Sequence, residues 1–290
     1  MKKILITGSD SYIGTSFERY ITRWPEKYHI NTIDMRGNNW KQVDFSGYDT
    51  VFHVAGIAHS NAGKLSKADK DIYYRVNTEL AIETAKKAKA DGVKQFIFMS
   101  SAIVYGESSP IGMKKIISKD SKPSPSNFYG DSKLKAEEGI LPLQNEEFII
   151  VILRPPMIYG KGSKGNYPIL SKFARILPFF PEVDNQRSVL YIENLCELVR
   201  QIIERSEKGV FCPQNERVVS TNDLVSAIAR AHKKRIVLFR GMTGFLSLFR
   251  GIRIINKAFG SFSYEMDLSE ISNIDYRVVD FESSIMRTEL

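Results

Sequence analysis

Residues 4–14 read Ile-Leu-Ile-Thr-Gly-Ser-Asp-Ser-Tyr-Ile-Gly and carry the clearest structural signal in the 290-residue chain. They begin with a short apolar run of the kind found in buried strands, after which Ile13, Phe17 and Ile21 recur at helical spacing. A glycine turn between a strand and a helix lets backbone N–H groups approach a diphosphate at the positive end of the helix. The segment therefore predicts a strand, a diphosphate-binding turn and a helix in succession.

A carboxylate follows this turn at the interval typical of dinucleotide binding. Asp34 stands twenty residues after Gly14, at the end of the next apolar run, where it can hold the adenosine ribose hydroxyls. Because Asp34 would repel a ribose 2′-phosphate, we expect NAD, although Arg36 is close enough to favour NADP instead. Ser11 replaces the middle glycine of the usual pattern, and its side chain either crowds the pyrophosphate or donates a hydrogen bond to it.

Short apolar runs alternate with helical stretches through the first half of the chain. We expect strands at 3–7, 30–33, 50–54, 95–99, 148–153 and 209–212, and helical patterns such as 76–90 and 193–205. This alternation predicts an α/β fold, a Rossmann-type doubly wound parallel sheet with a smaller, discontinuous C-terminal substrate domain. The dinucleotide-binding domain is expected at 1–154, completed by about 191–212, and the substrate-binding domain at 155–190 and 213–290.

The composition is that of an ordinary globular protein, with 43% hydrophobic and 26% charged residues. These values exclude a disordered chain, a collagen-like repeat and a disulfide-built miniprotein. Apolar runs stay below the roughly 18 residues that cross a bilayer, and the N-terminal apolar stretch is too short for a signal peptide, so we expect a cytoplasmic protein. Cys196 and Cys212 lack metal-ligand spacing and are expected to be buried apolar residues, and we predict no metal site.

The net charge of +8 is unevenly distributed along the chain. The segment from Ala231 to Tyr264 contains no Asp or Glu but several Lys and Arg among apolar residues. Such a segment can form a basic wall near ligand phosphates or a membrane-surface helix. We favour the basic wall, keep contact with a membrane surface as the less favoured alternative, and expect no nucleic-acid partner.

A serine pair, a tyrosine and a lysine form the candidate catalytic group. Ser100 and Ser101 end the strand expected at 95–99, and such sheets place their chemistry at the carboxyl ends of strands. Tyr129 and Lys133 are four residues apart, so they share one face of a helix. A lysine ammonium and an oxidised nicotinamide would lower the pKa of the phenol from its usual ~10, which makes Tyr129 a candidate general base. A serine hydroxyl beside it could bind the same substrate oxygen.

Several segments occur in the order typical of one enzyme family. They are ILITGSDSYIG (4–14), VFHVAGIAH (51–59), RVNTE around Asn77, FMSSAIVYG (98–106), FYGDSKLKAE (128–137), LRPPMIYGKG (153–162) and RSVLYIENL (187–195). On these segments the sequence resembles the extended short-chain dehydrogenase/reductase family, in particular its NAD-dependent sugar-nucleotide epimerases, dehydratases and reductases. It looks most like the UDP-glucose 4-epimerase group, and the resemblance becomes loose beyond about residue 213.

This resemblance implies a role for each motif residue. The catalytic residues would be Ser101, Tyr129 and Lys133, with Ser100 as the alternative serine. The cofactor would be bound by Gly8, Ser11, Tyr12, Ile13, Gly14, Asp34, Arg36, Asp44, Phe45, Ala55, Gly56, Asn77, Ser100, Tyr129 and Lys133, with Asp44 and Phe45 near the adenine. The nucleotide sugar would be bound by Ser101, Asn166 and Arg187, with Arg187 pairing to its diphosphate.

The implied activity is 4-epimerisation of a nucleotide sugar, expected to be UDP-linked, by transient oxidation at C4. An NAD(P)H-dependent 4-ketoreductase of a nucleotide-linked keto sugar is the alternative, because 290 residues are few for a 4-epimerase. A non-catalytic dinucleotide-binding protein is the third reading, with the Ser11 replacement as its only support. A 4,6-dehydratase is disfavoured, because Ala102 and Ile103 stand where that enzyme carries an Asp-Glu pair. The family also implies a homodimer.

Overall fold

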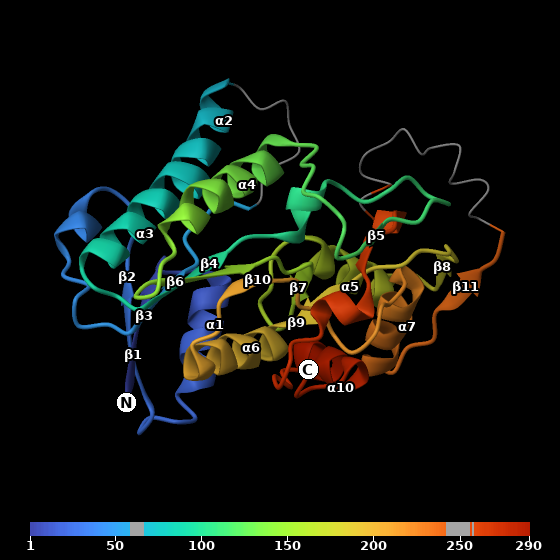
Figure 1. The fold of residues 1–290 in the computed structure, drawn as a ribbon. Helices are drawn as coiled ribbons and strands as arrows, with labels where there is room; N and C mark the ends of the chain where they lie inside the picture. Colours follow the sequence, from blue (N-terminus) through green and yellow to red (C-terminus); the bar gives the residue numbers. More distant parts are fainter. Residues whose placement is uncertain (59–66, 242–255, 257) are drawn as a thin grey trace. The chain divides into compact units, whose positions relative to one another are not determined.

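The computed structural model describes residues 1–58, 67–241, 256 and 258–290 (Figure 1). The chain divides into two compact units. The first unit contains Met1–Gly106, Pro123–Arg154 and Cys196–Phe211, and the second contains Glu107–Lys122, Pro155–Leu195 and Cys212–Leu290. These bounds differ from the expected domains at 107–122, 191–195 and Cys212, which belong to the second unit. Part of the acid-free segment, residues 242–255 and 257, lies outside the described residues.

A six-stranded parallel sheet forms the centre of the first unit (Figure 1). Its strands are β1 (Lys2–Thr7), β2 (Tyr28–Ile33), β3 (Thr50–His53), β4 (Gln95–Met99), β6 (Ile149–Leu153) and β10 (Gly209–Phe211). Across the sheet their order is β10-β6-β4-β3-β1-β2. The predicted Rossmann-type sheet is confirmed, and each strand expected from an apolar run is present within two residues of its expected bounds.

The strand order reverses beside β1. β2 pairs with one edge of β1, and β3 pairs with the other. In a doubly wound sheet, ligands bind outside the carboxyl ends of the strands at such a reversal. β1 and β3 end at Thr7 and His53, which are partners in the β-sheet register. The topology therefore places the candidate site just beyond these two residues.

Helices cover both faces of this sheet. They are α1 (Tyr12–Ile21), α2 (Lys67–Tyr74), α3 (Leu80–Ala90), α4 (Phe128–Ile140) and α6 (Ile192–Arg205), whose residues from Cys196 onward belong to the first unit. Figure 1 shows α2, α3 and α4 on one face and α1 and α6 on the other. Leu5 and Phe96 pack with Ala85 of α3 in the buried core of the first face. On the other face, the ring centres of Phe17 and Phe52 are 5.4 Å apart.

The second unit is built from shorter elements. They are β5 (Ile116–Ile117), β7 (Met157–Tyr159), α5 (Asn166–Ile176), β8 (Phe179–Pro181), β9 (Val189–Tyr191), α7 (Thr221–Ala231), β11 (Val237–Phe239), β12 (Ser263–Tyr264) and α10 (Phe281–Glu289). The strands form three parallel pairs, β7 with β9, β8 with β11 and β5 with β12. A short 3₁₀ turn lies at Met266–Ser269, and the first unit has similar turns at Asn39–Gln42, Ala102–Tyr105 and Leu141–Leu143. Within the described parts of the chain, no helix has both the length and the apolar character needed to cross a membrane.

Candidate active site

The turn after β1 approaches the loop after β3 more closely than a side chain would allow. Gly8 has a φ of 125°, and a Cβ atom built on it would lie 2.7 Å from the backbone nitrogen of Ala55. The backbone N–H groups of Gly8 and Ser9 both donate to the carbonyl of Ile33, at 2.9 and 3.2 Å. Glycine is therefore required at position 8, because any other residue would be strained and would displace the neighbouring backbone.

The first turn of α1 shows what Ser11 and Gly14 do in the fold. Ser11 is the N-cap of the helix, and its Oγ accepts from the Gly14 N–H at 3.4 Å. A Cβ on Gly14 would lie 3.0 Å from Val54 and 3.2 Å from Ile6, so this glycine lets α1 pack closely on the sheet. Tyr12 and Ile13 form the half-buried start of the helix. The replacement at position 11 thus leaves a capped helix N-terminus.

The carboxylate of Asp34 lies just beyond β2 and is exposed. Asp34 accepts from the backbone N–H of Arg36 at 2.9 Å and forms an ion pair with the guanidinium at 2.6 Å. These contacts with Arg36 lower the pKa of Asp34 to about 2, so the carboxylate is charged at neutral pH. Arg36 also reaches Asp10 at 3.4 Å. Asp34, which favours NAD, and Arg36, which favours NADP, are therefore bound to each other.

Asp44 and Phe45, expected near an adenine, have different surroundings. Asp44 is exposed, and its carboxylate accepts from the backbone and hydroxyl of Ser46, which lowers its pKa. The ring of Phe45 is fully buried in the core, with the Lys87 ammonium 4.9 Å from its centre. The ring of Phe45 is consequently not available for stacking on a ligand.

Asn77 fastens the loop after β3 to two helices. It lies in a π-helical turn, Arg75–Glu79, between α2 and α3, where the sequence predicted continuous α-helix. Its side-chain oxygen accepts from the Ile57 N–H at 2.8 Å, and its amide donates to the Ile57 carbonyl at 3.0 Å and to the Ser132 hydroxyl at 3.1 Å. Single π-turns inside helices are frequent at functional sites. Here the turn places the buried side-chain amide of Asn77 against the loop after β3, which borders the candidate site.

The structure distinguishes the two serines at the end of β4. Ser100 is only 4% exposed and donates its hydroxyl to the carboxylate of Glu137, which is itself 1% exposed. Glu137 is paired with the guanidinium of Arg154, which also donates to the Tyr105 hydroxyl at 2.7 Å. Ser100 therefore belongs to a buried polar network beneath the site.

Ser101 has a different partner from Ser100 and is hydrogen-bonded to Tyr129. Ser101 is half-buried, caps the 3₁₀ turn Ala102–Tyr105, and interacts with the phenol through its side chain. Burial raises the pKa of Tyr129 to about 12, and the hydrogen bond with Ser101 opposes that rise. The expected lowering of this pKa by Lys133 is not what the structure shows: burial of the phenol is the largest cause of the shift, and Lys133 is not one of its causes. Ser101 is the serine that can share a ligand oxygen with Tyr129.

Lys133 is buried on α4, one turn beyond Tyr129. Its ammonium donates to the Met99 carbonyl at 2.8 Å and lies 4.7 Å from the ring centre of Phe98. A Cβ on Gly56 would approach the ammonium to 3.2 Å, so the lysine also reaches the loop after β3. Burial lowers the pKa of Lys133 to about 8, against the opposing charge of Glu137.

Two predicted substrate-binding residues lie in the second unit. Asn166 is half-buried and begins α5. Arg187 is buried, and its guanidinium donates to the carbonyls of Ala258 and Gly260, both at 3.2 Å. Burial lowers the pKa of Arg187 to about 10, so it carries its charge at neutral pH.

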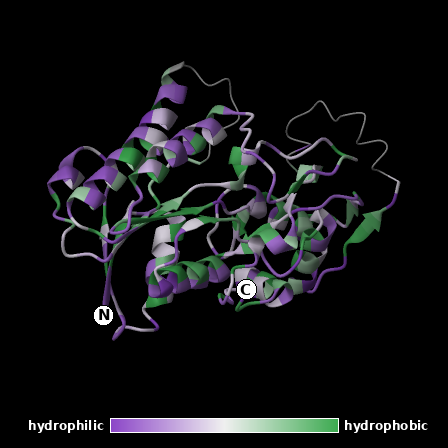
Figure 2. Cartoon of the chain, in the orientation of Figure 1, coloured by the Kyte–Doolittle hydropathy of each residue, from purple (hydrophilic) through white to green (hydrophobic). Residues whose placement is uncertain are grey.

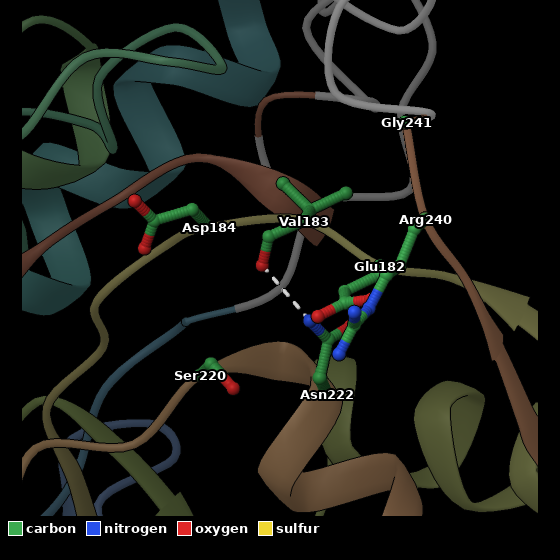
Figure 3. A pocket seen from close by; sticks show the side chains of 7 residues that line it. All are labelled: Glu182, Val183, Asp184, Ser220, Asn222, Arg240 and Gly241. Carbon is green, nitrogen blue, oxygen red and sulfur yellow. Dashed lines mark hydrogen bonds and ion pairs between the residues drawn. The ribbon is translucent and has the colours of Figure 1, made fainter.

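A cavity of about 450 Å³ in the second unit has no counterpart in the sequence prediction (Figure 3). It is lined by Glu182, Val183, Asp184, Ser220, Asn222, Arg240 and Gly241. Figure 3 shows the Asn222 amide directed at the Val183 carbonyl, a hydrogen bond of 3.0 Å, and Arg240 beside Glu182, 3.3 Å away. None of the residues predicted to bind substrate is part of this lining.

Sequence reasoning missed three buried residues around the site. Glu137 and Arg154 lie in the family motifs at 128–137 and 153–162. Their ion pair could not be predicted from residue spacing, because the two positions are distant in the sequence. His53 is fully buried at the end of β3 and hydrogen-bonded to the Thr7 hydroxyl at 2.7 Å. Burial and the charge of Lys133 lower the pKa of His53 to about 3, so it is neutral.

Comparison with known proteins identifies the class of the molecule. The model of the NAD dependent epimerase/dehydratase family matches residues 4–211, so the chain belongs to this enzyme family and the expected resemblance is confirmed. A UDP-glucose 4-epimerase from Vibrio cholerae is 30% identical over 254 residues, which cover 80% of this chain and 76% of that protein.

Solved structures share the fold over nearly the whole chain. A dTDP-4-dehydrorhamnose reductase from Clostridium acetobutylicum superposes with a TM-score of 0.72 at 16% identity, covering 99% of this chain and 98% of that one. A UDP-glucuronic acid 4-epimerase from Bacillus cereus, solved in complex with NAD, gives a TM-score of 0.69 at 18% identity, covering 99% and 95%. At these identities the similarity demonstrates the fold and leaves the reaction to be argued from the site.

Proposed function

We propose that the protein is an NAD-dependent sugar-nucleotide 4-epimerase that oxidises C4 of a UDP-hexose transiently. The observation that carries the proposal is the hydrogen-bonded pair of Ser101 and Tyr129, with Lys133 anchored on the Met99 carbonyl. Ser101 follows the carboxyl end of β4, and Lys133 of α4 contacts the last residue of that strand, on the sheet whose order reverses beside β1. The 30% identity to a UDP-glucose 4-epimerase supports the same reaction.

The residues around the turn fit a dinucleotide. Gly8 lets the turn lie against the backbone of Ala55, and the N-terminus of α1 follows this turn, where backbone N–H groups can bind a pyrophosphate. The exposed Asp34 carboxylate is placed to accept from ribose hydroxyls, and its ion pair with Arg36 leaves that cation less free for a 2′-phosphate. We therefore propose NAD as the cofactor, with NADP as the alternative.

Each catalytic residue has one task in this mechanism. Tyr129 accepts the proton of the sugar 4-hydroxyl, while the Ser101 hydroxyl donates to the same oxygen as it becomes a carbonyl. NAD, when bound, supplies the hydride acceptor and a positive charge that favours the phenolate. Lys133 stays one turn away on α4, bound to the Met99 carbonyl. Because burial holds the pKa of Tyr129 near 12 with Lys133 already in place, the phenol is protonated until the charge of the bound cofactor acts on it.

We propose that Asn166 and Arg187 bind the nucleotide part of the substrate. Arg187 supplies a planar cation suited to two phosphate oxygens, and Asn166 stands at the N-terminus of α5, where backbone N–H groups favour an anion.

The assignment of 1–154 with 191–212 to the dinucleotide and of 155–190 with 213–290 to the substrate is part of the same proposal. A cytoplasmic homodimer also stays a prediction, and light scattering of the purified protein tests its dimeric state.

The direct assay supplies UDP-glucose or UDP-N-acetylglucosamine without added reductant. We expect the 4-epimer to accumulate to equilibrium with one of these sugars. Turnover only when NAD(P)H and a nucleotide-linked 4-keto sugar are both supplied would instead identify a 4-ketoreductase. Binding of dinucleotide with no turnover of any of these sugars would favour the non-catalytic reading.

Replacing each serine separately should separate catalysis from stability. Ser101→Ala removes the hydrogen bond that opposes the raised pKa of Tyr129, so we expect a lower rate at neutral pH and a pH–rate profile displaced to higher pH. Ser100→Ala leaves Glu137 with one hydrogen bond fewer and should lower the free energy of unfolding by about 1–3 kcal/mol without displacing the profile. A displaced profile for Ser100→Ala alone would reverse the assignment.

Replacing Asp34 by alanine should change cofactor choice. The variant loses a charged acceptor for ribose hydroxyls and releases Arg36 to pair with a 2′-phosphate. We expect the ratio of the NAD Kd to the NADP Kd to rise by about tenfold or more, as the loss of a hydrogen bond to a charged group predicts. Asp10→Asn is the matched control, since it removes the charge of the weaker contact to Arg36 at 3.4 Å and keeps a residue type that tolerates the φ of 61° at this position. An equal effect in both variants would contradict the role given to Asp34.

A further inference from the structure

An exposed apolar surface covers one region of the second unit. We call it the α5–β11 surface, and it consists of Ile169, Phe173, Ile176, Leu177, Phe179, Val237 and Phe239, each between 38% and 63% exposed. Three of these residues, Ile169, Phe173 and Ile176, recur at helical spacing on one face of α5. Exposed apolar residues are ordinary when scattered, whereas a contiguous group of them marks an interaction site.

Register and hydrogen bonds show that the strand part of this surface is contiguous. Phe179 of β8 is the register partner of Val237 of β11, and Phe239 follows two residues later on the same side. The intervening residue of β8, Phe180, is buried on the opposite side. Figure 2 shows β11 in the hydrophobic colour, although it lies at the surface.

The end of α5 joins the same surface. The backbone N–H of Val237 donates to the carbonyl of Pro178, which connects α5 to β8, at 3.0 Å. The Lys234 ammonium donates to the carbonyl of Arg175 in the last turn of α5. The helix end, β8 and the start of β11 are therefore neighbours, and the two apolar faces meet there.

Most of the exposed charges that border this surface are positive. Glu182, whose backbone N–H donates to the Phe239 carbonyl at 3.0 Å, is acidic and is paired with Arg240. Exposed cations lie on α5 and on the segment between α7 and β11, namely Lys172, Arg175, Lys233, Lys234 and Arg235. α5 contains no acidic residue, and none occurs in the sequence between Ala231 and Tyr264. Two copies of such a surface would repel each other, because symmetric pairing brings like charges together. Apolar side chains with flanking cations are instead complementary to the interface of an anionic bilayer.

We propose that the α5–β11 surface binds the surface of an anionic phospholipid membrane. The exposed aromatic and aliphatic side chains enter the headgroup region, and the lysines and arginines pair with lipid phosphates while their stems lie along the apolar surface. The protein would then act as a peripheral membrane protein, a property independent of which sugar reaction it catalyses.

Vesicle co-sedimentation of the full chain, without nucleotide, tests this proposal. We expect sedimentation with vesicles of phosphatidylglycerol and phosphatidylcholine at low salt, and little with phosphatidylcholine alone or at high salt. Replacing Lys233 and Arg235 by glutamine should weaken binding by about tenfold or more, since each cation near an anionic surface contributes about fivefold. Phe179→Ser with Phe239→Ser should weaken it comparably, and because both rings are exposed the fold should be retained.

Matched control variants remove exposed positive charges or exposed apolar side chains from positions outside the α5–β11 surface. Lys27→Gln with Lys208→Gln removes two exposed positive charges, and Met113→Ser with Val278→Ser removes two exposed apolar side chains. Binding equal to the wild type in both controls supports the proposal. Failure of the wild type to sediment, or equal losses in controls and surface variants, overturns it. It is also overturned if the Phe179 and Phe239 variant keeps vesicle binding but changes the molar mass or the KM for nucleotide sugar, because the surface would then serve another ligand.

Discussion

Tyr129→Phe is expected to reduce the rate of sugar-nucleotide turnover by about 10²–10⁴-fold, the contribution of a positioned general acid–base group. The change removes one oxygen and leaves the ring, which makes a T-shaped contact with Tyr73 at 6.3 Å between ring centres. The effect should therefore fall on kcat, with the fold and the Kd for NAD retained. Steady-state kinetics and dinucleotide titration of the purified variant measure the two quantities.

Tyr74→Phe provides the matched control for this prediction. The Tyr74 hydroxyl donates to Asp131 of α4 at 2.7 Å, so the control also removes a hydrogen-bonded tyrosine hydroxyl and leaves the ring. We expect its rate to stay close to that of the wild type. A Tyr129→Phe enzyme with nearly full activity, or an equal loss in the two variants, would refute the catalytic role of Tyr129.

Glu137→Ala is expected to cause the largest loss of stability, about 3–5 kcal/mol, because it leaves the buried Arg154 without its counter-ion. The same change deprives Ser100 of its hydrogen-bond acceptor beneath the site. Urea unfolding of the full chain, followed by fluorescence and by circular dichroism, measures the effect.

A second set of variants separates the ion pair from general damage to α4. Glu138→Ala alters the neighbouring exposed carboxylate and should change stability by no more than about 0.5 kcal/mol. The double variant Glu137→Met with Arg154→Met removes both charges and should recover much of the loss, since apolar replacement of a whole buried pair is often close to neutral. If the double variant is as unstable as Glu137→Ala, the ion pair is not the cause.

The sheet of the first unit was predictable because its strands are buried on both faces. Residues 95–99, for example, are all buried in β4, and such strands appear in the sequence as continuous apolar runs. The second unit has strands of only two or three residues, which leave no periodic pattern. β5 pairs with β12, so Ile116 lies beside Ser263, and this distant pairing is why 107–122 joins the second unit.

The parts of the candidate site that depend on the spacing of residues along one helix or strand could be predicted from the sequence. Tyr129 and Lys133 are held by one helix, and the serine pair ends one strand, as the sequence indicated. Burial is not encoded in spacing, however. The sequence could not show that Ser100 is committed to Glu137, that the ring of Phe45 lies in the core, or that desolvation raises the pKa of Tyr129.

Transient oxidation at C4 is tested most directly by a substrate labelled at that carbon. The UDP-sugar that turns over, UDP-glucose or UDP-N-acetylglucosamine, is prepared with deuterium at C4 and incubated with the protein without added reductant, and both 4-epimers are analysed by NMR and mass spectrometry. The proposed mechanism predicts a 4-epimer that retains the deuterium at C4, because the hydride removed from one face returns to the other face of the same carbon. A product with hydrogen from solvent at C4 would contradict the mechanism, as would 4-epimer formation by a Tyr129→Phe enzyme at the wild-type rate.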